Sequence, residues 1–173
     1  MKPFRNAVLF VAAALLSMNA MAQTEKDVVD VASGSKDHTT LVTAIKAADL
    51  VTTLKGKGPF TVFAPTNTAF TNLPGGTLDN LLKPANKSML AGILTYHVVA
   101  GEMNEKAILA EIKKGGGKAV LTTVAGGKLT AAVVSDKVVL TDEKGGKSTV
   151  SATNLEASNG VIHVVDKVLM PKD

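Results

Sequence analysis

Three histidines, His38, His97 and His163, are the side chains best suited to acid–base or metal chemistry. None of them stands in a His-Glu-x-x-His arrangement, and the chain has no cysteine to complete a zinc site. The sequence also lacks a Gly-x-Ser-x-Gly nucleophile motif and the full Gly-x-x-x-x-Gly-Lys-Ser/Thr pattern of a phosphate-binding loop. We therefore predict no catalytic residue, no metal site and no cofactor, and we predict that the protein is not an enzyme.

A remote alternative is a small exported hydrolase. It would combine His97 or His163 with a neighbouring Ser or Thr and an acid, but no spacing in the chain supports a positioned nucleophile and base.

His97 follows the only tyrosine of the chain, and two interpretations of this pair remain open. Buried polar groups are normally satisfied internally, which favours a partly buried His97 whose ring nitrogens are held by neighbouring groups. The second interpretation is an exposed recognition patch made by Leu94, Tyr96, His97, Val98 and Val99.

The other two histidines have simpler interpretations. His163 alternates with Val161 and Val165 along an apolar run, so we expect it on the core face of a strand. His38 lies near a predicted helix start, so we expect a solvated surface residue.

The first part of the chain has helical periodicity. Apolar residues recur at helical spacing in five places, and breakers follow several of them. The expected helices are a short one over Asp27–Ala32, one capped by Asp37 with Leu41, Ile45 and Ala48 on one face, a turn or two capped by Thr77, one with Met89, Leu90, Ile93 and Leu94 toward the core, and one capped by Asn104 and stopped at Gly115–Gly117.

From Lys118 onward the apolar residues alternate, as in strands. Short β-branched runs are separated by Gly-Gly and Ser-Asp turn signals, which predicts an antiparallel meander. The expected strands are 119–124, 128–134, 138–141, 148–153 and 161–165, and an earlier buried strand is expected at Phe60–Ala64. Helices followed by such strands indicate an α+β domain.

The N-terminus has the pattern of a secretory signal peptide. Lys2 and Arg5 precede an apolar run, and Ala20-Met21-Ala22 is a small-x-small cleavage site. We therefore expect residues 1–22 to be a signal peptide and residues 23–173 a single domain, exported to the periplasm or the extracellular space. The apolar run is shorter than a bilayer requires, so we expect no membrane insertion after cleavage.

Charge disfavours nucleic-acid binding. Removing Lys2 and Arg5 lowers the formal net charge from +4 to about +2, and Arg5 is the only arginine in the chain. The mature chain then has no guanidinium group to recognise phosphates or base edges in bidentate fashion.

Two segments and the Tyr-His pair between them resemble the fasciclin domain family. The first is Gly58-Pro59-Phe60-Thr61-Val62-Phe63-Ala64-Pro65-Thr66-Asn67-Thr68-Ala69-Phe70, and the second is Ser158-Asn159-Gly160-Val161-Ile162-His163-Val164-Val165-Asp166-Lys167-Val168-Leu169-Met170-Pro171. The signature residues are Thr61, Phe63, Pro65, Thr66, Asn67, Phe70, Asn159, Gly160, His163 and Asp166.

The resemblance implies a fasciclin-like fold, in which an antiparallel β-wedge packs against several α-helices. It implies that the two segments form adjacent core strands, and that Thr66 and Asn67 close the first strand and cap the next helix. It also implies extracellular adhesion, with a protein-binding patch near Tyr96-His97.

The expected partner is a cell-surface or matrix protein. A polysaccharide is less favoured than a protein because few aromatic side chains are available to stack on sugars. The alternative function is a periplasmic structural or stress-related factor without an external ligand.

Overall fold

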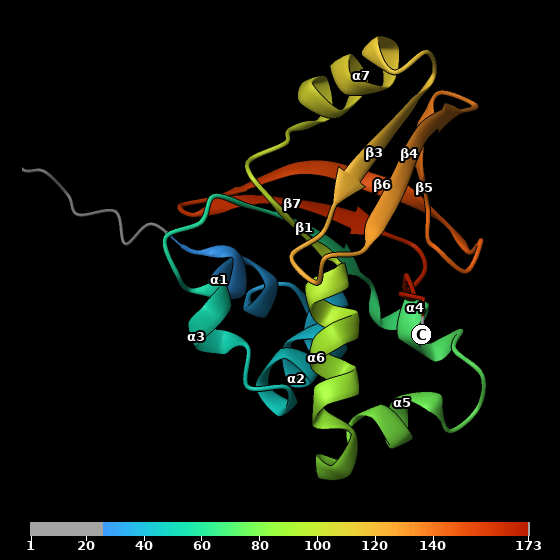
Figure 1. Cartoon of the computed structure of the whole chain (residues 1–173). Helices are drawn as coiled ribbons and strands as arrows, with labels where there is room; N and C mark the ends of the chain where they lie inside the picture. Colours follow the sequence, from blue (N-terminus) through green and yellow to red (C-terminus); the bar gives the residue numbers. More distant parts are fainter. Residues whose placement is uncertain (1–25, 173) are drawn as a thin grey trace, which may run out of the picture.

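The computed structural model describes residues 26–172, and the predicted signal peptide lies outside them. Seven α-helices and seven strands are present in this part of the chain (Figure 1). The α-helices are α1 (Val28–Ser33), α2 (Thr39–Ala47), α3 (Val51–Leu54), α4 (Asn67–Thr71), α5 (Thr77–Leu81), α6 (Lys87–Tyr96) and α7 (Glu105–Lys114); short 3-10 helices are η1 (Lys36–His38) and η2 (Pro84–Asn86). The strands are β1 (Phe60–Pro65), β2 (Val98–Ala100), β3 (Lys118–Thr122), β4 (Lys128–Val134), β5 (Lys137–Thr141), β6 (Lys147–Ala157) and β7 (Gly160–Val165).

The strands form one curled sheet in the order β2-β1-β7-β6-β5-β4-β3. The meander from β3 to β7 is antiparallel, as predicted, whereas β1 and β7 pair in parallel from Phe60↔Gly160 to Pro65↔Val165. The two signature segments are therefore adjacent strands, as the resemblance implied. A bridge between Val99 and Thr123 brings the two ends of the sheet together.

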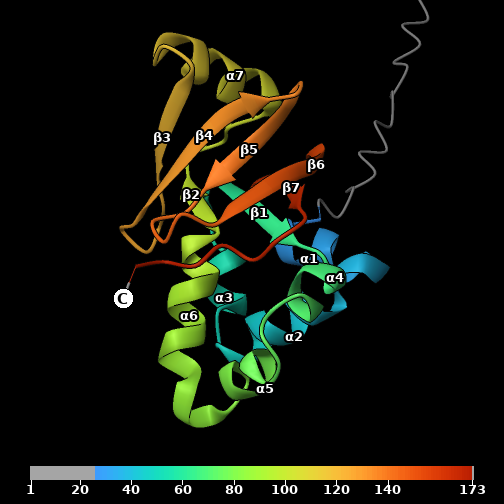
Figure 2. The same cartoon turned by 90° about the vertical axis from the view of Figure 1, so that its right-hand side faces the viewer.

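Helices α1–α6 gather below the sheet, and α7 lies across the far end of the β-half (Figures 1 and 2). The α+β class and the wedge-and-helices architecture are confirmed. Within residues 26–172, none of the helices combines the length and apolar character that crossing a membrane requires.

Two apolar cores lie on opposite sides of the central strands. The first packs helices α1–α6 against Val62 and Ala64 of β1, and the second fills the curled sheet around Phe63, with Ile108 and Ile112 of α7. A strand buried on both faces reads as a continuous apolar run, and this explains why β1 lacks the alternation seen in β3 to β5.

The helix caps follow the sequence in part. Asp27 and Asn104 cap α1 and α7 with their side chains, but Asp37 caps nothing. Ser35 caps η1 instead, and α2 begins at Thr39 without a cap from the preceding residue. Thr77 is likewise the first residue of α5 rather than its cap, since Gly76 takes that position with a left-handed backbone.

Two burial predictions are wrong. Met89 is 61% exposed, because it lies on the outer side of α6 while Leu90, Ile93 and Leu94 face the core. His38 is only 4% exposed, because the η1 turn places its ring beneath the surface rather than in solvent.

Candidate functional site

Tyr96 and His97 lie where α6 ends and β2 begins, and both are buried. Tyr96 is 0% exposed and His97 is 2% exposed, and the neighbours Leu94, Val98 and Val99 are buried as well. The interpretation of these five side chains as an exposed patch is therefore wrong. The physical reason is that α6 leads directly into β2, which pairs with β1. The side chains at this junction therefore pack into both cores, Leu94 into the helical one and Tyr96 into the one inside the curled sheet.

The Tyr96 hydroxyl joins two hairpins to the end of α6. It donates to the Lys128 carbonyl oxygen at 2.7 Å and accepts from the Glu143 backbone N–H at 3.1 Å. The ring also lies against Gly127, where a β-carbon would come within 2.6 Å of it. Burial raises the pKa of Tyr96 to about 12, so the hydroxyl remains protonated and able to donate.

His97 ties α6 to the segment that follows β7. Its Nε2 accepts from the Leu169 backbone N–H at 2.9 Å, so the proton is assigned to Nδ1, which lies 2.8 Å from the Ile93 carbonyl oxygen. Burial lowers the pKa of His97 to about 4, although the Ile93 carbonyl and the charge of Asp142 oppose that shift. His97 is thus a neutral structural group at pH 7.

His163 is in the core, as predicted, and has the opposite tautomer. Its Nε2 lies 2.7 Å from the Met103 carbonyl oxygen, while Nδ1 accepts from the Asn154 backbone N–H at 3.4 Å. Its ring stacks on Phe63, with 5.6 Å between the ring centroids. Both nitrogens are occupied by backbone groups, which leaves no free lone pair for catalysis or metal binding.

Thr61, the signature residue of β1 with a polar side chain, also bonds to backbone groups. Its hydroxyl donates to the Gly101 carbonyl oxygen at 2.7 Å and accepts from the Met103 backbone N–H at 2.8 Å. This pair of bonds fixes the loop between β2 and α7.

Asn159 connects the start of β7 to the helices. Its amide nitrogen donates to the Leu54 and Gly56 carbonyl oxygens at 2.7 and 2.9 Å, and its Oδ1 accepts from the Val28 backbone N–H at 2.9 Å. The next residue, Gly160, lies directly against β1: a β-carbon there would be 2.0 Å from the Phe60 carbonyl oxygen. The Asn-Gly pair is therefore required by contacts and not by a tight turn alone.

Thr66 and Asn67 divide the roles that the resemblance gave them jointly. Thr66 caps α4 by accepting from the Ala69 backbone N–H, as expected. Asn67 instead reaches the start of α2, where its Oδ1 accepts from the Thr40 backbone N–H at 2.9 Å and its Nδ2 donates to the Lys36 carbonyl oxygen. This contact supplies the cap that α2 lacks locally.

The other signature residues are structural too. Pro65 ends β1 opposite Val165, and Phe70 is buried in the helical core. Asp166 accepts from the Thr149 backbone N–H at 2.7 Å and from the Ser148 hydroxyl at 3.1 Å.

Sequence reasoning did not identify Asp142 as a structural residue. Asp142 is buried and accepts from three backbone N–H groups, those of Lys144, Gly146 and Met170. The Asp-x-x-x-Gly spacing signals the turn, but the contact with Met170 joins positions far apart in the chain.

Two of the hollows on the surface of the described residues bear on function. The smaller, of about 280 Å³, lies between α5, α6 and the segment after β7, and Leu81, Met89, Ile93, Lys144 and Met170 are among its lining residues. It adjoins the Tyr96-His97 junction: the Ile93 carbonyl contacts His97, and Met170 follows Leu169, whose N–H His97 holds.

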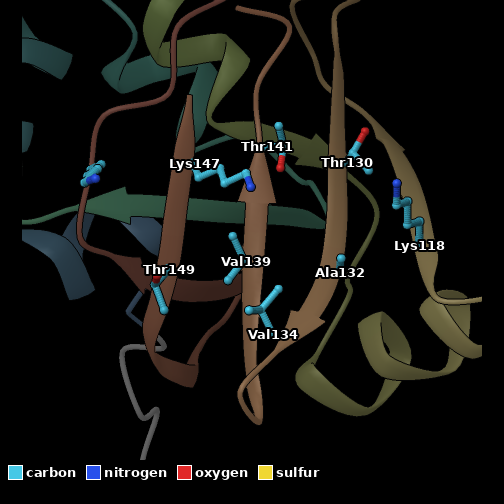
Figure 3. A pocket seen from close by; sticks show the side chains of 9 residues that line it. Lys118, Thr130, Ala132, Val134, Val139, Thr141, Lys147 and Thr149 are labelled. Carbon is cyan, nitrogen blue, oxygen red and sulfur yellow. The ribbon is translucent and has the colours of Figure 1, made fainter. Parts of the chain in front are cut away.

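The larger hollow, of about 610 Å³, lies on the outer face of β3, β4, β5 and β6 (Figure 3). Three threonines and three lysines line it together with small apolar side chains. The lining residues are Lys118, Thr130, Ala132, Val134, Val139, Thr141, Lys147, Thr149 and Lys167.

Comparison with known proteins connects this architecture to one family. The Fasciclin domain model matches residues 36–171. Protein sll1483 of Synechocystis sp. is 47% identical over 88% of this chain and 77% of its own length, and immunogenic protein MPB70 of Mycobacterium bovis is 33% identical over 88% and 73%.

A solved structure of a FAS1 domain pair from the insect cell adhesion molecule Fasciclin I has the same fold. Its TM-score is 0.75 at 18% identity, and the match covers 84% of this chain and 51% of that chain. With two signature strands paired in the core and a family match over nearly all the described residues, this chain belongs to the fasciclin domain family.

Proposed function

We propose that this protein is an exported, non-catalytic recognition domain that serves adhesion or cell-surface and matrix interaction, in the periplasm or outside the cell. The observation that carries the proposal is the family match over residues 36–171. The relation to an insect cell adhesion molecule supports the same function. The contacts of His97 and His163 support the non-catalytic part of the proposal, because the ring nitrogens of both residues are held by backbone groups.

We place the protein-binding patch beside the Tyr96-His97 junction rather than on its rings. The apolar hollow there carries Met89, which is 61% exposed on α6. An unbranched, polarizable methionine adapts to different apolar partner surfaces. Tyr96 and His97 would act as positioning residues, because they hold the chain segments that form the hollow: Glu143 next to Lys144, and Leu169 next to Met170.

The partner that suits this hollow is a protein segment with an apolar side chain to insert. The test is binding of the purified protein to intact cells and to immobilised matrix proteins, comparing the wild type with Met89→Glu. Met89 is exposed, so the substitution should leave the fold intact while a charge in the hollow reduces saturable binding at least tenfold.

The matched control is Leu155→Glu, which puts the same charge at an exposed apolar residue of β6 outside the hollow. Circular dichroism should be the same for all three proteins. Equal binding by the wild type and Met89→Glu would reject the hollow as the patch. Absence of binding by the wild type would favour the periplasmic structural or stress-related factor.

A further inference from the structure

The outer face of the β3–β6 sheet is a second surface, separate from the hollow beside Met89. Each of the four strands begins with an exposed lysine: Lys118, Lys128, Lys137 and Lys147. The second residue of every strand is buried, so the alternation of side chains turns each lysine outward. Because neighbouring strands are antiparallel, the lysines fall at both ends of the face and the larger hollow lies between them.

The hollow itself is positively charged. Lys118, Lys147 and Lys167 line it, and no carboxylate does. Within residues 26–172, none of these three ammonium groups forms an ion pair. Asp166 precedes Lys167 in the chain, but its Oδ1 already accepts from Ser148 and Thr149.

Between the lysines the hollow presents hydroxyl groups over a small apolar floor. Thr130 pairs with Thr141 across β4 and β5. Two residues further along the strands, on the same outer face, Val139 pairs with Ala132 of β4 and with Thr149 of β6. Figure 3 shows the Lys147 side chain extending from β6 toward Thr141, with Lys118 on β3 at the other side. Threonine hydroxyls donate and accept, whereas ammonium groups only donate.

The backbone of this face is occupied by pairing between strands, so a ligand must be recognised by side chains. A peptide laid on the face would leave its own N–H groups with few acceptors, since the threonine hydroxyls are the only acceptors among the lining side chains. A sugar chain with carboxylates has no main-chain N–H to satisfy, and its hydroxyls match the threonines. No aromatic ring lines the hollow, which disfavours a neutral sugar that binds by stacking.

We propose that this hollow binds a polysaccharide with carboxylate groups, of the uronic acid class. The lysines pair with the carboxylates and the threonines with the sugar hydroxyls. This refines the sequence-based preference against a polysaccharide: stacking is excluded by the lack of aromatic groups, whereas charge and hydroxyl recognition are not. Exposed lysine–carboxylate pairs are screened by salt, so binding should weaken as ionic strength rises.

The experiment is titration of the purified protein with sodium polygalacturonate at low and physiological salt. A triple variant, Lys118→Gln/Lys147→Gln/Lys167→Gln, should lose at least tenfold in affinity. The control triple, Lys36→Gln/Lys46→Gln/Lys57→Gln, removes the same charge from exposed residues of the helical half and should bind like the wild type. Thr130→Val/Thr141→Val keeps the charge and should lose about threefold or more, which bulk attraction would not explain.

Three outcomes would overturn the proposal: no binding of polygalacturonate, equal loss in the two lysine triples, or binding of poly-glutamate as tight as that of polygalacturonate. The last would identify an acidic peptide ligand instead. Met89→Glu should leave polygalacturonate binding unchanged, so this test and the test of the protein-binding patch fail independently.

Discussion

At the scale of single residues, side-chain amides act as long-range connectors in this protein. Asn159 joins β7 to backbone groups at Val28, Leu54 and Gly56, and Asn67 joins α4 to the start of α2. An amide carries donors and an acceptor on one short side chain, so it can satisfy carbonyl and N–H groups at the same place. This explains the use of asparagine at both positions better than turn or cap propensity does.

Asn159→Asp should lower the free energy of unfolding by about 2–4 kcal/mol. The carboxylate has nearly the same shape, but it faces the Leu54 and Gly56 carbonyl oxygens without donors, and leaving such groups unpaired costs about 1–3 kcal/mol each. Denaturant unfolding measures the change. Asn72→Ala, at an exposed position at the end of α4, is the control and should change stability by less than about 0.5 kcal/mol. Equal stability of Asn159→Asp and the wild type would contradict the connector role.

Phe63→Ala should cost about 3–5 kcal/mol, because it empties a fully buried site in the sheet core. The substitution also removes the ring that stacks on His163. Phe63→Leu keeps most of the volume and should cost less. Urea unfolding of the two variants separates packing from stacking, and a loss well under 1 kcal/mol for Phe63→Ala would contradict its place in the core.

At the scale of elements, the sequence predicted what local patterns determine. Strand β4 begins and ends at the predicted residues, and Asn104 caps α7 because the cap lies next to its helix. The cap of α2 was not predictable in this way, since Asn67 supplies it from a distant position. Asp142 was not identified for the same reason: its contact with Met170 appears only in the folded chain.

The candidate site shows the same limit. Pattern and resemblance identified Tyr96-His97 as a special position, but local sequence does not determine whether an aromatic pair at a helix end faces solvent or core. The fold decides it, because β2 follows α6 directly and pairs with the buried strand β1.

Tyr96→Phe tests how this junction holds the hairpins. The variant keeps the ring but loses the bonds to the Lys128 carbonyl and the Glu143 N–H, and it should lower the free energy of unfolding by about 1–2 kcal/mol. Hydrogen exchange at the Glu143 amide should accelerate relative to the wild type. Exchange in β1 and β7 should change only in proportion to global stability. Unchanged protection at Glu143 would show that the hydroxyl does not hold that turn.

At the scale of the whole molecule, the two cores share the central strands and should unfold together. Val62 and Ala64 face the helical core while Phe63 between them faces the sheet core. In the same way Ile162 and Val165 of β7 contribute to different cores. Loss of either core removes the packing on one face of these strands, so we expect a single cooperative unfolding transition. The transitions followed by helix signals and by sheet signals should therefore have the same midpoint.

Three buried histidines make stability dependent on pH. Burial lowers the pKa of His38, His97 and His163 below the usual value for histidine, to about 4 for His97. The unfolded chain therefore binds protons near pH 6.5 that the folded chain does not, and stability is full above that pH and falls as the pH decreases toward the folded pKa values. From His97 alone the loss between pH 7 and pH 5 should be about 2 kcal/mol.

Chemical denaturation at several pH values from 8 to 5 measures this dependence, and His97→Gln isolates one contribution. The variant should be less stable than the wild type at pH 8, because glutamine cannot reproduce both ring contacts with Ile93 and Leu169. Its stability should nevertheless fall less steeply with decreasing pH, since it has lost a group that is protonated only on unfolding. The difference between the two proteins should therefore shrink by about 2 kcal/mol from pH 7 to pH 5. Parallel curves would mean that His97 titrates alike in the folded and unfolded chains. That result would contradict the burial of His97 between α6 and the segment after β7.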